Sequence, residues 1–162
     1  MTEFSTRQTV RHSPNKMFNL VADIEAYPQF VPLCEDLQII EQRQGCEAAE
    51  GSEIVIADMT MAYKLFRETF RSRVTLSPAG KEHDSQGHKA PQILVEYLDG
   101  PFSHLENRWQ FHESADGGSE VEFYIAYEFR RRAVQMMVGP VFDKVFRRFI
   151  DAFEARADQL YG

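Results

Sequence analysis

The sequence predicts an α+β fold in which a curved, antiparallel sheet of seven strands wraps around a long C-terminal helix. Two observations carry this prediction. Between residues 3 and 129, seven short stretches alternate apolar and polar side chains, which is the period of half-buried strands. The last thirty residues instead repeat apolar side chains every three or four positions, as an amphipathic helix does. Because short turns join the strands, we expect consecutive strands to be neighbours in the sheet.

The N-terminal part predicts one strand and then a short helical segment. Residues 3–12 alternate and form the first strand. Ser13 is a suitable N-cap, and Pro14 suits the first helical position. The apolar stripe of this helix is formed by Met17, Leu20, Val21 and Ile24. Pro28 predicts its end, because a proline disrupts the interior of a helix.

Six more strands follow, and they are predicted from residue 37 to residue 129. We expect their cores at 37–39, 54–65, 66–76, 92–98, 104–112 and 120–129. Turn-forming residues at 45–51 and 113–120 join two of the pairs, and a long polar segment at 77–91 predicts an exposed loop. Alternation this regular is typical of an antiparallel sheet with one wet face.

The terminal helix decides what fills the concave face of the sheet. Its apolar stripe is wide and rich in phenylalanine, and Gly139-Pro140 predicts a kink or a restart near its beginning. A wide aromatic stripe is typical of a solidly packed core. The alternative is an elongated apolar pocket between helix and sheet for a lipid-like ligand.

Composition places the chain among soluble proteins of the cell interior. At 162 residues we expect a single domain spanning 1–162. The net charge of −7 argues against DNA and broad nucleic-acid binding, although local basic groups occur at 129–132 and 144–148. No apolar run reaches the roughly 18 residues of a membrane span, and the N-terminus resembles no secretory signal. Cys34 and Cys46 are read as reduced thiols of a cytoplasmic protein.

Catalytic and metal-binding patterns are weak in this sequence. His104 and His112 are eight residues apart on one predicted strand, too far to share a metal, and His83 and His88 fall in the polar loop. We therefore predict no metal site, no cofactor and no enzyme activity. Glu68 is the one candidate for an inward carboxylate that could act as a general base, although pairing with an arginine is the simpler interpretation.

The connection at 26–36, "AYPQFVPLCED", is unusually apolar for a loop. It is either a buried plug that closes one end of the core or the apolar border of an opening. The prolines stiffen it in either case. As a border, it would also allow docking on a bilayer surface, which predicts peripheral contact with the inner face of a membrane.

Two motifs then resemble a known family. The residues "V.DIEAYPQFVPLC.D..I" at 21–39 and "GPF..L...W.F" at 100–111, within this order of elements, are similar to the coenzyme Q-binding branch of the START (helix-grip, Bet v 1-like) superfamily. That group is also described as oligoketide cyclases and lipid transport proteins, and it includes the bacterial ribosome-association toxin. The resemblance covers nearly the whole chain. It implies a helix-grip fold with a hydrophobic tunnel.

The resemblance implies a function in lipid binding. We expect non-catalytic binding or transport of ubiquinone or a related polyisoprenoid lipid in support of respiration. The expected ligand-binding residues are Tyr27, Phe30, Val31, Pro32, Leu33, Phe70, Trp109, Phe142, Val145 and Phe149. Hydroxyls of Tyr63, Tyr97 and Tyr127 would either bond a quinone carbonyl or bond the backbone. Two alternatives remain: a toxin-like protein that contacts the ribosome through its basic groups, and a polyketide aromatase/cyclase.

Overall fold

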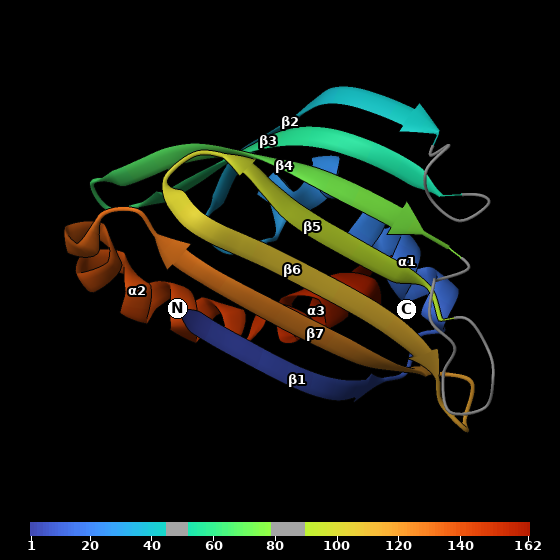
Figure 1. Ribbon diagram of the computed structural model, residues 1–162. Helices are drawn as coiled ribbons and strands as arrows, with labels where there is room; N and C mark the ends of the chain where they lie inside the picture. Colours follow the sequence, from blue (N-terminus) through green and yellow to red (C-terminus); the bar gives the residue numbers. More distant parts are fainter. Residues whose placement is uncertain (45–51, 79–89) are drawn as a thin grey trace.

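The computed structural model describes residues 1–44, 52–78 and 90–162, and it contains one curved antiparallel sheet with helices on its concave side (Figure 1). The elements are β1 (Thr2–Val10), α1 (Pro14–Ala22), the 3-10 helix η1 (Ile24–Gln29), β2 (Cys34–Gln44), β3 (Glu53–Tyr63), β4 (Phe66–Ser77), β5 (Gln92–Asp99), β6 (Phe102–Glu113), β7 (Ser119–Phe129), α2 (Arg132–Phe146) and α3 (Phe149–Tyr161). The predicted fold class is confirmed. The turn expected at 45–51, most of the loop expected at 77–91, and Cys46, His83 and His88 lie outside the described residues.

The strand order is β1-β7-β6-β5-β4-β3-β2, and each neighbouring pair is antiparallel. Only β1 joins the sheet out of sequence, beside β7. The register places Met59 opposite Phe70 and Trp109 opposite Phe123, so that large side chains share the concave face. Breaks in register occur in the β2–β3, β4–β5 and β6–β7 pairs. Such bulges add bend and twist, which helps the sheet curve around the helices.

Helix α1 begins as the sequence predicts. The Ser13 hydroxyl accepts a hydrogen bond from the backbone N–H of Lys16, and Pro14 follows at the first helical position. Met17 and Val21 are completely buried, and the helix packs near β5, β6 and β7. A 3-10 helix, η1, then contains Pro28 rather than ending before it. While α1 packs near β5 to β7, η1 packs against β2 at the other edge of the sheet.

The C-terminal part corrects one prediction: it forms two helices instead of a single long one. Helix α2 runs through Gly139 and Pro140 without restarting there. The helical conformation is instead interrupted at Arg147 and Arg148, between α2 and α3. The backbone N–H of Arg148 bonds to the carbonyl of Val145 at 3.0 Å, a three-residue closure that tightens the last turn of α2. After the break, α3 crosses the concave face toward α1.

Candidate functional site

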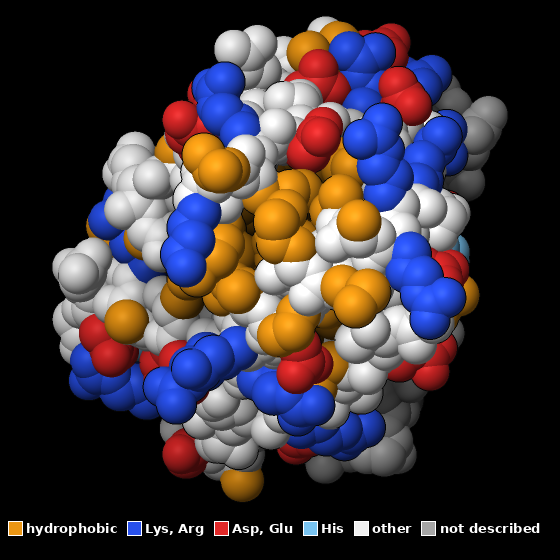
Figure 2. Space-filling view, turned by 90° about the vertical axis from the view of Figure 1, so that its left-hand side faces the viewer, with side chains coloured by type: hydrophobic (Ala, Val, Ile, Leu, Met, Phe, Trp, Pro, Cys, Tyr) orange, Lys and Arg blue, Asp and Glu red, His pale blue; other side chains and the backbone are white. Residues whose placement is uncertain are grey.

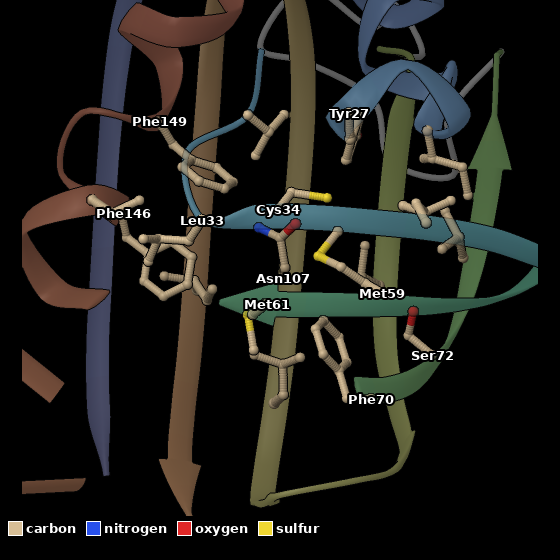
Figure 3. A pocket seen from close by; sticks show the side chains of 18 of the residues that line it. Tyr27, Leu33, Cys34, Met59, Met61, Phe70, Ser72, Asn107, Phe146 and Phe149 are labelled. Atoms are coloured by element: carbon tan, nitrogen blue, oxygen red, sulfur yellow. The ribbon is translucent and has the colours of Figure 1, made fainter. Parts of the chain in front are cut away.

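A pocket lies between the concave face of the sheet and the segments η1, α2 and α3 (Figure 3). Its walls come from six strands, β2 to β7, as well as from the helices. The lining residues are Ile24, Tyr27, Val31, Pro32, Leu33, Cys34, Leu37, Ala57, Met59, Met61, Phe70, Ser72, Val74, Ile93, Val95, Phe102, Leu105, Asn107, Trp109, Ile125, Phe142, Val145, Phe146, Phe149 and Phe153. Most are aliphatic, aromatic or sulfur-containing. This composition suits an apolar ligand.

The pocket is narrow in this conformation. It holds about 100 Å³ of space that water could occupy, and about 950 Å³ when all space between atoms is counted out to the opening. Aromatic side chains fill much of the rest: Phe153 packs edge-to-face on Trp109 at 4.9 Å between ring centroids, and Phe149 lies 5.6 Å from Phe123. The interior is therefore neither solid nor an open tunnel.

Asn107 places a polar side-chain amide in the otherwise mostly apolar wall of the pocket. Its Nδ2 donates to the carbonyl of Tyr124 at 2.9 Å, and its Oδ1 accepts from the indole Nε1 of Trp109 at 3.0 Å. These two bonds fix the amide and leave one N–H and one oxygen lone pair for a further partner. Figure 3 shows Asn107 among apolar neighbours such as Leu33 and Met61. A polar group of a bound ligand would find its partner here.

Tyr27 and Cys34 are the ionisable groups of the lining, and both are held neutral. The Tyr27 hydroxyl donates to the carbonyl of Val21, and burial raises the pKa of Tyr27 far above its usual value. Burial raises the pKa of the Cys34 thiol to about 11, with a smaller contribution from the charge of Asp36. A thiol with this pKa is a poor nucleophile at neutral pH.

The opening of the pocket, here called the mouth, is bordered by exposed or half-buried residues of the connection and of the α2–α3 break: Pro32, Leu33, Val145, Phe146 and Phe149. Leu33 adopts a left-handed conformation with φ of 68°, and its carbonyl accepts the backbone N–H of Ala62 at 3.0 Å. This bond holds the connection against the end of β3. Tyr27 and Val31 are buried, whereas Pro32 and Leu33 are not. The connection therefore both closes one end of the core and borders the opening of the pocket.

Nine of the ten ligand-binding residues expected from the sequence line this pocket; the exception is Phe30. Phe30 packs against the rings of Tyr27 and Phe153, and the guanidinium of Arg156 lies 5.3 Å from its centroid. Phe30 directly follows η1 and packs against α3, so it contacts lining residues without lining the pocket itself. The role of the other nine in ligand binding stays a prediction.

Glu68 does not enter the pocket. Its register opposite Met61 matches the expected side of the sheet, but the side chain is exposed at the end of β4. Solvation there avoids the large cost of burying an unpaired carboxylate.

The predicted tyrosines also lie outside the lining. The hydroxyl of Tyr97 accepts the backbone N–H of Phe102, and that of Tyr127 donates to the carbonyl of Gly139. Of the two alternatives expected for these hydroxyls, a quinone carbonyl or a backbone group, both therefore bond the backbone. Tyr63 lies beside the ammonium of Lys64, which is 5.4 Å from its ring centroid. In the described part of the chain no three histidine, cysteine or acidic side chains are placed to hold a metal.

Several lining residues were not predicted from the sequence, although a pattern could have found them. Asn107 lies between Leu105 and Trp109 at the two-residue period of β6, so alternation alone places it on the apolar face. Ser72 has the same relation to Phe70 and Val74 in β4. A polar residue on an apolar strand face is the observation that identifies both.

The comparison with known families covers most of the chain. Residues 10–154 match the family described as "Polyketide cyclase / dehydrase and lipid transport". The chain belongs to this family. Apolar-ligand binding is consistent with both the family description and the pocket.

Two relatives carry different names. The protein is 26% identical to the ribosome association toxin RatA of Escherichia coli, over 100% of this chain and 90% of that protein. It is 24% identical to the mitochondrial coenzyme Q-binding protein COQ10 homolog B of Xenopus laevis, over 99% of this chain but 59% of the relative. The chain therefore spans little more than half of the second relative.

Three solved structures of bacterial proteins have a similar shape. An 18 kDa protein of Caulobacter crescentus is 30% identical, with a TM-score of 0.72 and coverage of 100% of this chain and 99% of that one. The Zhui aromatase/cyclase of Streptomyces has a TM-score of 0.74 at 16% identity, over 98% of this chain and 94% of its own. A START superfamily protein of Mycobacterium smegmatis has a TM-score of 0.71 at 18% identity, with 98% of both chains covered. These last two likenesses concern the fold.

Proposed function

We propose that the protein binds and carries ubiquinone or a related polyisoprenoid lipid, without changing it chemically, in support of respiratory electron transport. The observation that carries the proposal is a pocket of apolar walls with one fixed amide, Asn107, that has hydrogen-bonding capacity left. A long apolar tail with a carbonyl-bearing head group complements such walls. The name of the Xenopus relative supports the choice of a quinone.

The lining argues against catalysis at this site. In the part of the chain that the structure describes, the lining contains no carboxylate, imidazole or ammonium group. Cys34 and Tyr27 are protonated at neutral pH because burial raises the pKa of each. A cyclase needs an acid or base within hydrogen-bond reach of its substrate. Since Glu68 is exposed, the aromatase/cyclase alternative lacks an acid or base in the pocket among the residues that the structure describes.

Ligand entry requires the pocket to widen. Pockets for drug-sized ligands usually hold about 300–1,000 Å³, which exceeds the 100 Å³ that water could occupy here. The α2–α3 break lies at the mouth, and such a break can absorb a change of backbone angles as a hinge. Movement of Phe146 and Phe149 away from the sheet would open the space for a tail.

The test begins with the purified protein. Extraction with organic solvent, followed by mass spectrometry, is expected to recover a quinone or related isoprenoid. Titration of emptied protein with a short-tailed ubiquinone analogue should quench the fluorescence of Trp109, the one tryptophan of the chain. An extract without lipid together with no quenching would exclude the proposal.

A pair of variants separates pocket binding from surface adsorption. Ala57 is buried in the lining, and Ala57→Phe should fill the pocket and abolish quenching. Ala133 is exposed on α2, so Ala133→Phe adds the same ring outside the pocket and should leave quenching intact. Circular dichroism of both variants shows whether the fold is kept.

Ribosome association is the second candidate function, because the Escherichia coli relative bears that name. The residues that would contact RNA are the exposed arginines Arg130, Arg131, Arg132, Arg147 and Arg148. Cosedimentation with ribosomal subunits that weakens steeply with added salt would support it. Absence of cosedimentation at low salt would remove it.

A further inference from the structure

A strongly basic segment runs along one side of the mouth. Residues 130–148 contain six Lys or Arg and one Asp, which gives a formal charge of +5 within a chain of −7. Arg147 pairs with Asp143. Among the described residues, no carboxylate oxygen lies within 4.0 Å of the exposed side chains of Arg131, Arg132, Lys144 and Arg148. This segment holds cations that internal ion pairs do not neutralise.

The same segment exposes apolar side chains between its cations. Met136 and Met137 are 73% and 59% exposed on the outer side of α2, while Val138 and Phe142 on the inner side are buried. Pro140 is also exposed, one turn further along. Helix α2 is thus apolar on its inner side and in the middle of its outer side, with basic residues at both ends. Exposed apolar side chains next to unpaired cations supply the two contributions that bind a protein to an anionic membrane surface, apolar burial and electrostatic attraction.

A further apolar side chain, outside α2, projects at the same end of the molecule. Leu65, in the turn between β3 and β4, is 100% exposed, and Lys64 precedes it. Its neighbour Phe66 contacts Phe142 of α2, with 5.9 Å between ring centroids. Figure 1 shows this turn and the start of α2 at one end of the sheet. Figure 2 shows that end with hydrophobic side chains gathered in the middle and Lys and Arg side chains around them.

We infer that this end is a docking surface for a membrane rich in anionic lipids. Leu65, Met136 and Met137 enter the interface, and Arg131, Arg132, Lys144 and Arg148 contact lipid phosphates. RNA phosphates would also attract the cations, but they offer no apolar environment to the leucine and the two methionines. The inference deepens the proposed function, because docking places the mouth where a lipid can pass directly between bilayer and pocket.

The docking surface borders the mouth through the connection. The carbonyl of Leu33 accepts the N–H of Ala62, two residues before the β3–β4 turn. On the other side, Lys144 and Arg148 flank Val145 and Phe146, which line the mouth. A protein seated on Leu65 and α2 therefore presents its mouth to the bilayer rather than to solvent.

Vesicle cosedimentation with the 162-residue chain tests the inference without any pocket ligand. Vesicles of phosphatidylcholine mixed with phosphatidylglycerol should bind the protein, binding should fall with added salt, and phosphatidylcholine alone should bind much less. The double variant Arg131→Gln/Arg132→Gln and the triple variant Leu65→Ser/Met136→Ser/Met137→Ser should each lower partitioning by about tenfold. These side chains are exposed, so the fold should be kept, as circular dichroism can verify.

Matched controls change the same residue types elsewhere. Lys16→Gln/Arg43→Gln removes two exposed cations from α1 and β2, and Leu160→Ser removes an exposed leucine from α3; neither should reduce vesicle binding. Equal binding to both vesicle types, or equal loss in the control variants, would overturn the inference. Binding of a short RNA but not of anionic vesicles would also overturn it, in favour of the nucleic-acid alternative. If vesicles bind but the pocket binds no quinone, the docking surface stands and the proposed function fails.

Discussion

At the scale of single residues, the amide of Asn107 is the proposed contact for a ligand head group. Asn107→Leu keeps the approximate size but removes the amide, and we expect the Kd for a short-tailed ubiquinone analogue to rise about tenfold. The variant also leaves the buried indole N–H of Trp109 without its acceptor, which should cost about 1–3 kcal/mol of folding free energy. Titration calorimetry and urea unfolding measure the two effects.

A ligand without a head group provides the control for Asn107→Leu. The affinity for a polyisoprenoid hydrocarbon of similar length should not fall, because such a ligand makes no hydrogen bond to the amide. An equal loss of affinity for both ligands would mean that the substitution distorts the pocket rather than removing a specific contact.

A second residue-scale prediction concerns pH. The carboxylate of Asp158 on α3 accepts from His12 Nε2 at 2.6 Å and from Arg11 Nε at 3.1 Å, and these bonds lower the pKa of Asp158. A carboxyl whose pKa is lower in the folded state stabilises the fold above its unfolded pKa, about 3.9. This contribution is lost as the pH falls through the folded pKa.

Asp158→Asn tests this linkage. At neutral pH the variant should unfold at a lower urea concentration than the wild type, and the difference should shrink as the pH is lowered below about 4. Urea midpoints measured from pH 7 down to pH 3 give the comparison. A difference that stays constant over this range would contradict the assignment.

At the scale of elements, the turn between β5 and β6 supports the pocket through a glycine. Gly100 has φ of 142°, and a Cβ there would lie 2.7 Å from the Cβ of Phe70, a lining residue. Gly117 has φ of 86°, but a Cβ there would meet no atom within 4 Å. We expect Gly100→Ala to lower the free energy of unfolding by about 2–4 kcal/mol and Gly117→Ala by about 1 kcal/mol. Gly100→Ala introduces both a steric clash and backbone strain, whereas Gly117→Ala introduces backbone strain alone. Chemical denaturation measures the free energy of unfolding of both variants, and their difference gives the contribution of the clash.

The break between α2 and α3 should control exchange of the ligand. Phe149, the first residue of α3, contacts Phe146 at 5.2 Å between ring centroids and stacks near Trp109. Phe149→Ala removes a half-buried ring at the mouth, so we expect a loss of about 2–3 kcal/mol in stability and a faster release of the quinone analogue. Stopped-flow measurement of Trp109 fluorescence gives the release rate. A release rate equal to that of the wild type would place the entrance elsewhere.

At the scale of the whole molecule, the alternation of the strands was sufficient to predict the sheet and its concave face. The break at Arg147 and Arg148 was not predictable in this way, because both residues favour helices, and the Gly139-Pro140 signal lies elsewhere. Glu68 was also beyond prediction by pattern. Alternation predicts which face of the sheet a side chain lies on, but not whether a helix covers that part of the strand. Whether aromatic side chains meet or leave a cavity depends on tertiary packing, which a one-dimensional pattern does not contain.

The pocket is narrow and must widen to accept a lipid tail. A ligand that binds only the folded protein stabilises it by about 2.7 kcal/mol when present at 100 times its Kd. If widening occurs at the α2–α3 break, backbone amides at residues 145–150 should exchange hydrogen readily in the empty protein and slowly with the short-tailed ubiquinone analogue bound. Amides in the central β6–β7 pair, where Trp109 faces Phe123, should change little because those strands stay paired. Hydrogen exchange followed by mass spectrometry compares the two segments in one experiment, and protection that rises in β6 and β7 but not at 145–150 would contradict a hinge at the break.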